Sequence, residues 1–251
     1  MTEIYLAPLL FFIIAFTFSM IGMGGSQLYV PILFWLGMDF KTQAIPLGLL
    51  LNVANSSSAA LTYGREKMID WKIAIPFSTA MILLPPLGTW VNISLPTKTI
   101  IIIFALFTIA AAALMLSGWR PKQGGLSSKG CTILGISGGS IVGFLAGLLG
   151  RGGGAFVVPL LYVAGLEARA AGATSAFVVT CSGASGFLSH ILTAAQPQWI
   201  TWISCLVSVL IASQLGSRFM AAKMKSKYVK LVFGTVLLGI AAALLFQGVS
   251  M

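Results

Sequence analysis

Long apolar runs separated by short polar stretches make up most of the chain. Each run approaches the roughly 17–25 residues that a helix needs to cross a bilayer. Apolar and polar positions do not alternate along the runs, as they would in the strands of a membrane barrel. The pattern predicts an all-α polytopic membrane protein with helices at about residues 4–21, 42–62, 73–93, 98–117, 131–149, 170–192, 199–219 and 228–247.

Two shorter apolar segments, at about residues 26–37 and 154–166, each follow a glycine-rich stretch. A helix of about 12 residues rises only ~18 Å, which is too short for a hydrocarbon core of ~30 Å. Each segment could lie on the membrane surface after a helix that crosses fully. Alternatively, each could return as the second arm of a re-entrant or broken-helix hairpin.

The two halves of the chain match at an offset of 128 residues, which superimposes Gly22 on Gly150. The same offset pairs Pro31 with Pro159, Trp71 with Trp199, and Gly88 with Gly216. Glycine and proline mark special backbone positions, so their recurrence favours a structural duplication. We therefore expect a first transmembrane repeat at 1–117, a cytoplasmic linker at 118–130 and a second transmembrane repeat at 131–251. Each repeat would hold one hairpin and three transmembrane helices.

The positions of Lys and Arg separate the two options for the short segments. If those segments lie on the surface, the halves are parallel and the basic residues, Arg151 aside, divide eight against six. If each segment returns as a hairpin, the halves are inverted and the division is twelve against two, with only Lys41 and Lys98 on the poorer side. Because such a bias orients membrane proteins, we expect inverted repeats with both termini outside.

Composition supports a membrane location, because 58% of the residues are hydrophobic and only 8% are charged. A soluble domain carries about a quarter charged residues. The net charge of +10 is interpreted as Lys and Arg in cytoplasmic loops, which set the orientation of the helices in the membrane. The sequence has no basic-aromatic patch that would bind nucleic acid. The N-terminal run lacks the basic flank of a cleavable signal, so we expect it to be retained in a multi-pass protein of the cell inner (plasma) membrane. The three scattered cysteines show no metal or redox spacing, and no cofactor is expected.

Inverted repeats with broken helices are typical of transporters that bind substrate near the bilayer midplane. At the breaks, Gly24, Gly25, Gly152 and Gly153 would let the chain turn and approach a ligand. The short helices would then begin with free N–H groups at Ser26, Gln27, Gly154 and Ala155. Such helix starts favour an anion.

Arg151 would be the one basic side chain near the midplane. Placing it there costs at least about 2.5–3.5 kcal/mol, which an anionic ligand would offset. The alternative is an ordinary loop arginine at the cytoplasmic surface. Its counterpart Met23 is neutral, so the two half-sites would not be equivalent.

Polar side chains follow each break in the next long helix. Asparagine amides and hydroxyl groups can donate to oxyanions without adding charge. The alternative for the hydroxyl residues is close helix packing, whereas unpaired asparagines would be costly in lipid. The candidates for substrate binding are Asn52, Asn55 and Ser57 in the first half and Thr180, Ser182 and Ser185 in the second.

Titratable residues are few within the apolar runs. His190 is the only histidine; it could shuttle protons, although a histidine at a helix end more often meets water. All five acidic residues fall in predicted loops or helix ends, where a proton-relay carboxylate is not expected. No P-loop and no acid–base constellation is present, so we expect neither an ATP-driven pump nor an enzyme.

The duplicated motif Gly-x-Gly-Gly-x-x-x-x-x-Pro, at Gly22–Pro31 and Gly150–Pro159, resembles the TauE/SafE sulfite exporter family. The segment IDWKIAIP around Trp71 and the Leu-Gly pairs at Gly88 and Gly216 are also similar. The resemblance covers nearly the whole chain. It implies transport of small sulfur-containing anions such as sulfite, thiosulfate or sulfonates such as sulfoacetate.

These observations predict a secondary transporter or exporter that alternates access around a midplane site. An inside-negative potential of 100 mV favours outward movement of one negative charge by about 2.3 kcal/mol, so export needs no coupled ion. The alternatives are a selective anion channel and proton-coupled uptake of an organic or sulfur anion. The expected partners are the anion and the lipid bilayer, with a homodimer left open.

Overall fold

The computed structural model describes residues 6–96, 127–150 and 152–223, with single positions between 98 and 116 and between 225 and 242. Arg151, residues 118–126 and most of the predicted helices 98–117 and 228–247 lie outside the described residues. The described part is helical and contains no strand. Five of its helical segments are long and apolar enough to cross a membrane. The chain is therefore an all-α polytopic membrane protein, as predicted.

The first half contains α1, α2, a π-helical turn η2, α3, α4 and α5, and the second half contains α7, α8, α9, a 3₁₀ turn η3 and α10. Their bounds are α1 Ala7–Ile21, α2 Ser26–Trp35, η2 Phe40–Ala44, α3 Ile45–Arg65, α4 Trp71–Leu83, α5 Pro85–Ser94, α7 Ser128–Leu149, α8 Gly154–Val163, α9 Ala168–His190, η3 Ile191–Thr193 and α10 Trp199–Lys223. α7 begins at Ser128 because the Ser127 hydroxyl accepts from the Gly130 N–H at 3.2 Å. The end of the predicted linker is thus helical.

The 128-residue offset also recurs in the backbone. α2 and α8 begin and end 128 residues apart, and so do the starts of α4 and α10. The glycines of the two breaks have matching positive φ angles, 71° at Gly22 and 61° at Gly150. Gly22 ends α1 and Gly150 ends α7 in the left-handed conformation. The N–H groups of the turn at each position donate to the last carbonyl oxygens of the helix.

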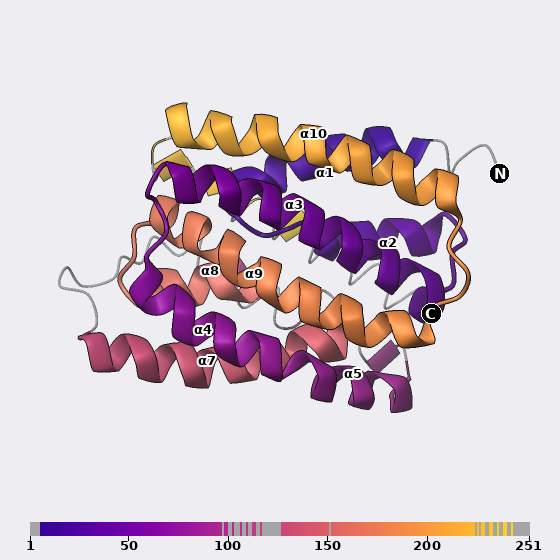
Figure 1. Cartoon of the computed structure of the whole chain (residues 1–251), viewed down its shortest axis with the longest axis horizontal. Helices are drawn as coiled ribbons and strands as arrows, with labels where there is room; N and C mark the ends of the chain where they lie inside the picture. Colours follow the sequence, from indigo (N-terminus) through magenta and orange to yellow (C-terminus); the bar gives the residue numbers. More distant parts are fainter. Residues whose placement is uncertain are drawn as a thin grey trace.

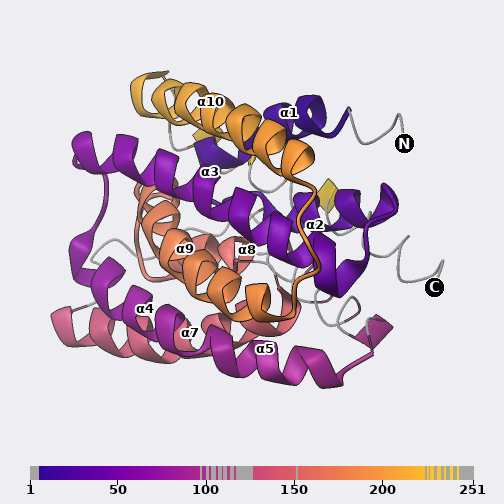
Figure 2. The same ribbon diagram turned by 45° about the vertical axis from the view of Figure 1, so that its right-hand side comes forward.

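α3 and α9 lie side by side in the middle of the bundle (Figures 1 and 2). α1 packs against α10 on one flank, and α4 and α5 pack against α7 on the other. Exchanging the two halves therefore reproduces the same set of neighbours. Small residues allow these close contacts, as at Gly216, where a Cβ would overlap the backbone of Phe16.

The corresponding helices α3 and α9 run antiparallel. Leu49 is the neighbour of Gly186, Asn52 is the neighbour of Gly183, and the Thr180 hydroxyl donates to Ser56 at 3.0 Å. Figure 1 shows the same opposition along the long axis of the bundle. Inverted halves require this opposite direction. Their insertion from opposite sides of a bilayer stays a prediction.

Basic residues gather at one end of the bundle. The end of α3, the starts of α4, α7 and α9, and the end of α10 all lie at the left of Figure 1. Lys41, which precedes α3, lies at the opposite end. The residues that these element ends bring together are Arg65, Lys72, Lys129, Arg169 and Lys223.

Candidate functional site

The two glycine breaks meet near the middle of α3. A Cβ placed on Gly154 would overlap the carbonyl oxygen of Met23, so the start of α8 touches the first break directly. Gly24 and Gly152 approach the Asn52 carboxamide together: a Cβ on Gly24 would lie 2.7 Å from its Cγ, and one on Gly152 would lie 2.5 Å from its Nδ2. All of these glycines are buried. The sequence stretches around residues 24 and 152 thus converge on one asparagine.

Asn52 is fully buried and holds the start of α2. Its Oδ1 accepts a hydrogen bond from the Ser26 N–H at 3.3 Å. Because a backbone N–H only donates, this contact assigns the carbonyl and amino ends of the side chain. The amino group, Nδ2, finds no hydrogen-bond partner among the described residues. The Ser26 N–H, expected to face a ligand, is instead occupied by this side chain.

Asn55 lies one turn further along α3 and has the opposite polarity. Its Nδ2 donates to the Gly24 carbonyl at 2.8 Å and lies 3.4 Å from the Tyr29 hydroxyl. The Gly24 carbonyl can only accept, so the orientation of this amide is also settled. Its Oδ1 is buried and has no partner within the described chain. The two amides therefore flank Gly24, with a spare donor on Asn52 and a spare acceptor on Asn55.

Further polar groups around the breaks are buried without partners. They include the Ser26 hydroxyl, both amide atoms of Gln27 and the Ser182 hydroxyl, counted within the described residues. Among the described residues, no hydrogen bond is seen for the backbone N–H groups of Gln27, Gly154 or Ala155. Native proteins pair nearly all buried polar groups with protein or ordered water, so this cluster is the candidate site for a polar ligand.

The remaining predicted hydroxyl residues have protein partners. Ser57 donates to the Ala54 carbonyl at 3.3 Å, and Ser185 donates to the Ile82 carbonyl at 2.6 Å. The single Thr180 hydroxyl proton can be donated either to the Ala176 carbonyl or to the Ser56 hydroxyl, and Ser56 in turn donates to the Asn52 carbonyl. These contacts correspond to the packing interpretation for Ser57 and Ser185. Thr180 joins the site through the backbone of Asn52.

The ends of the broken long helices are held by side chains that sequence analysis did not assign to this task. The Tyr63 hydroxyl donates to the Ser19 carbonyl of α1 at 2.5 Å. At the second break, Asn92 of α5 donates to the Leu148 carbonyl of α7 at 2.6 Å. One carbonyl before each break thus has a side-chain donor, in contrast with the unpartnered groups after it.

His190 differs from its sequence interpretation. It is the last residue of α9, but only 2% of its surface is exposed. Its Nε2 lies 3.2 Å from the Gly147 carbonyl of α7. The expectation that it meets water is therefore wrong, because the end of α9 packs against α7.

Arg151 lies outside the described residues, so its role stays a prediction. Its chain neighbours Gly150 and Gly152 are buried, as are Gly153 and Gly154. No group of three or more His, Cys, Asp or Glu that could hold a metal occurs among the residues that the structure describes.

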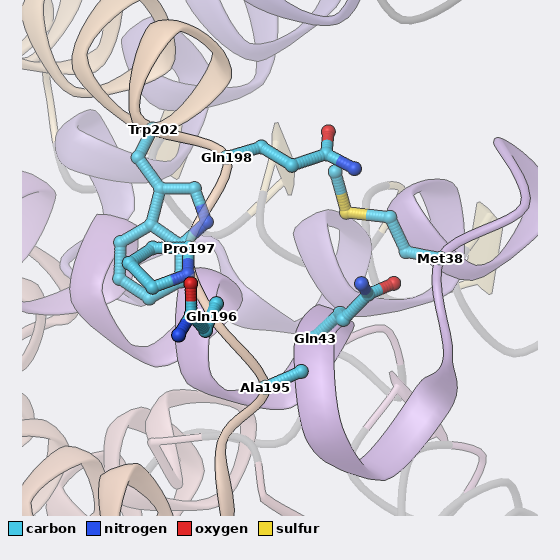
Figure 3. A pocket seen from close by; sticks show the side chains of 7 residues that line it. All are labelled: Met38, Gln43, Ala195, Gln196, Pro197, Gln198 and Trp202. Atoms are coloured by element: carbon cyan, nitrogen blue, oxygen red, sulfur yellow. The ribbon is translucent and has the colours of Figure 1, made fainter.

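Two cavities lie outside this cluster. The smaller, about 10 Å³, is seen in Figure 3 and has room for about one water rather than a sulfur oxyanion. The larger, about 600 Å³, opens between the α4–α5 kink and α9. The smaller is lined by Met38, Gln43, Ala195, Gln196, Pro197, Gln198 and Trp202, and the larger by Ile82, Pro86, Thr180, Cys181, Ala184, Ser185, Leu188, Ser189 and Leu192.

The two flanks of the bundle differ next to α3 and α9. Pro85 and Pro86 begin α5 shortly after α4 ends at Leu83, and Pro86 borders the large cavity. At the equivalent positions of α10, the Ser213 hydroxyl donates to the Asn55 carbonyl at 2.7 Å, and Gln214 donates to the Ser58 hydroxyl at 2.7 Å. One flank is therefore closed by polar contacts, whereas the other leaves a groove.

Comparison with known proteins identifies a family. The family described as Sulfite exporter TauE/SafE matches residues 7–244. The chain is 25% identical over 256 residues to the probable membrane transporter protein YunE of Bacillus subtilis (strain 168), covering 92% of this chain and 93% of that protein.

Two further relatives have similar names. The chain is 26% identical over 254 residues to the probable membrane transporter protein MJ0441 of Methanocaldococcus jannaschii, covering 92% of each. It is 25% identical over 235 residues to the probable membrane transporter protein y4hK of Sinorhizobium fredii, covering 88% of this chain and 91% of that protein. No solved structure matches the chain.

Proposed function

We propose that this chain, which belongs to the sulfite exporter TauE/SafE family, carries small sulfur-containing anions across the membrane by alternating access around its two glycine breaks. Membership of the family and the likeness to probable membrane transporters make it a multi-pass membrane transporter. The cargo, the site and the mechanism are our proposal. The cargo class is taken from the family description and comprises sulfite, thiosulfate and sulfonates such as sulfoacetate.

The observation that carries the proposal is the convergence of both breaks on Asn52. The Asn52 amino group and the Ser26 and Ser182 hydroxyls offer donors in a buried setting. The N–H groups of Gly154 and Ala155 at the start of α8, for which no described hydrogen bond is seen, would add to them. Donors at helix starts stabilise negative charge, and they do so more strongly where water is excluded. An oxyanion is the ligand that this collection suits best.

Alternating access is supported by the difference between the flanks. The contacts of Ser213 and Gln214 close α10 onto α3, whereas the α4–α5 kink leaves the groove beside α9. In transporters built from inverted repeats, alternating access is largely a rocking of one repeat against the other around a fixed site. We expect the α10 contacts to break when the α4–α5 flank closes.

Export down the membrane potential needs no proton-carrying carboxylate. The described acidic residues Asp39, Glu66, Asp70 and Glu167 all lie at the ends of helices. An inside-negative potential of 100 mV would favour outward movement of one charge by about 2.3 kcal/mol. The protein would lie in the cell inner membrane with the basic end of the bundle facing the cytoplasm. Both termini would then lie on the outer side.

Flux into proteoliposomes tests this function. We expect purified protein to move sulfite, thiosulfate or sulfoacetate with saturable, voltage-dependent rates. Asn52→Ala removes a donor to the anion, and a hydrogen bond to a charged group contributes about 1.5–3 kcal/mol. Binding should weaken about 10- to 150-fold, while Ser137→Ala, which removes an exposed hydroxyl bonded within α7, should bind normally.

Arg151→Ala should weaken binding to a similar degree if the arginine meets the anion. Single-channel currents instead of saturable flux would favour the selective anion channel. Dependence of uptake on a proton gradient would favour coupled uptake. Absence of binding by every sulfur anion tested would overturn the proposed function.

A further inference from the structure

The groups left without partners at the breaks are not donors alone. Asn52 offers an N–H donor, whereas Asn55 offers a carbonyl acceptor, and Gln27 offers one of each. The polarity of both asparagines is settled by backbone partners, the Ser26 N–H and the Gly24 carbonyl. A fully deprotonated oxyanion can satisfy only the donors. The Asn55 oxygen would then face an electron-rich ligand, which leaves a buried acceptor unpaired.

We propose that the site takes an anion that also carries a hydrogen-bond donor, such as a monoprotonated sulfur oxyanion. The Asn52 amino group would donate to an oxygen of the anion, and the Asn55 carbonyl oxygen would accept from its O–H. This inference rests on the proposed function and narrows its cargo to monoprotonated sulfite, because thiosulfate and sulfonates carry no such O–H near neutral pH. The proton would cross with the anion, so each turnover moves one negative charge.

The surroundings of Asn55 contain no described carboxylate that could supply or remove this proton. The titratable side chain facing it is Tyr29 of α2, with Cys205 of α10 near that tyrosine. On α9, Cys181 lies in the membrane-spanning segment Ala168–Thr193 and lines the groove. Tyrosine and cysteine ordinarily lose their protons above neutral pH, so between pH 5.5 and about 7.5 the ligand itself would dominate the pH dependence.

A pair of matched ligands tests the inference. Sulfite at pH 6 is largely the monoprotonated monoanion, whereas methanesulfonate is a monoanion of similar size with a methyl group in place of the donor. Calorimetric binding to the purified full-length protein should favour sulfite by at least about tenfold, because a site that pairs a ligand proton rejects the analogue lacking it. The sulfite affinity should fall from pH 6 to pH 7.5, while the methanesulfonate affinity stays constant.

Substitution of Asn55 tests whether this side chain causes the preference for sulfite over methanesulfonate. Asn55→Ala should reduce the preference for sulfite over methanesulfonate to within about twofold, whereas Asn52→Ala should weaken both ligands. Thr89→Val is the matched control, because it removes another buried hydroxyl without a described partner, on α5, and should leave the preference unchanged.

The outcomes separate this inference from the function on which it rests. If neither ligand binds to the wild type, this inference is overturned, and the proposed function fails with it if thiosulfate and sulfoacetate also do not bind. If both bind equally and without pH dependence, the function stands and this inference is overturned. The wild-type comparison decides this even if Asn55→Ala does not fold.

Discussion

Gly154→Ala is the sharpest perturbation of the contact between the two breaks. Gly154 is the first residue of α8, and the Cβ of an alanine would lie 2.7 Å from the Met23 carbonyl carbon, closer than real Cβ atoms approach such an atom. The obstructing atoms belong to the backbone, so no side-chain rotation can relieve them. Overpacking of this kind costs about 1–3 kcal/mol.

Helix propensity acts in the opposite direction. Glycine within a helix is less favourable than alanine by about 0.5–1 kcal/mol, so without the contact the substitution would stabilise the protein. The equivalent position in the first half is Ser26, which shows that a Cβ is compatible with the start of this helix. We therefore expect net destabilisation of up to about 2 kcal/mol, because overpacking exceeds the gain in propensity.

Thermal unfolding of the purified protein at one scan rate measures this effect. Gly138→Ala in α7 is the control, since its Cβ would meet nothing nearer than 3.7 Å and should leave the unfolding temperature unchanged or raise it. We expect Gly154→Ala to lower the unfolding temperature and the rate of anion flux. An increase in unfolding temperature for both variants would refute the contact between the breaks.

Three further predictions concern other parts of the chain. The Thr42 hydroxyl and N–H lower the pKa of Asp39, so the stability that Asp39 contributes is present above its unfolded-state pKa and is lost as pH falls through its folded-state pKa. Asp39→Asn should therefore reduce the loss of stability at acidic pH in thermal unfolding, and an unchanged pH profile would contradict this. Lys41 donates to the last carbonyls of α5, so Lys41→Met should destabilise the protein by about 1–3 kcal/mol in chemical unfolding, whereas no change would show that the cap contributes nothing. Cys181 lines the groove and Cys205 is buried, so mass spectrometry after treatment with a small maleimide should find Cys181 modified before Cys205. Faster reaction of Cys205 would contradict the described flank.

The pattern of the sequence predicts the helices well because it records two strong physical constraints. A long apolar run must hydrogen-bond its own backbone in lipid, which yields a helix. A Gly-x-Gly-Gly stretch ends such a helix, and Gly22 and Gly150 do so with similar positive φ angles. α3 and α9 run antiparallel, which is the direction that the inverted arrangement predicted from the charge distribution requires.

The sequence predicts the region of the candidate site but not the hydrogen bonds within it. Glycine, asparagine and hydroxyl residues at the breaks indicate where polar groups gather, but not which of them satisfy one another. Asn52 uses its oxygen on Ser26, and Ser185 turns to the Ile82 carbonyl. These choices depend on the angle between packed helices and on side-chain rotamers, which no pattern along one chain contains. The burial of His190 is missed for the same reason, because it results from α9 packing against α7.

The central claim is that glycine-interrupted hairpins from opposite sides of the membrane meet at Asn52 and hold the anion there. An electron cryomicroscopy structure of the protein in lipid nanodiscs, determined with sulfite at pH 6, tests it most directly. The account predicts ligand density between Gly24 and Gly152, in contact with the Asn52 amino group. Ligand density confined to the groove beside α9, or both hairpins entering from one side of the nanodisc, would contradict it.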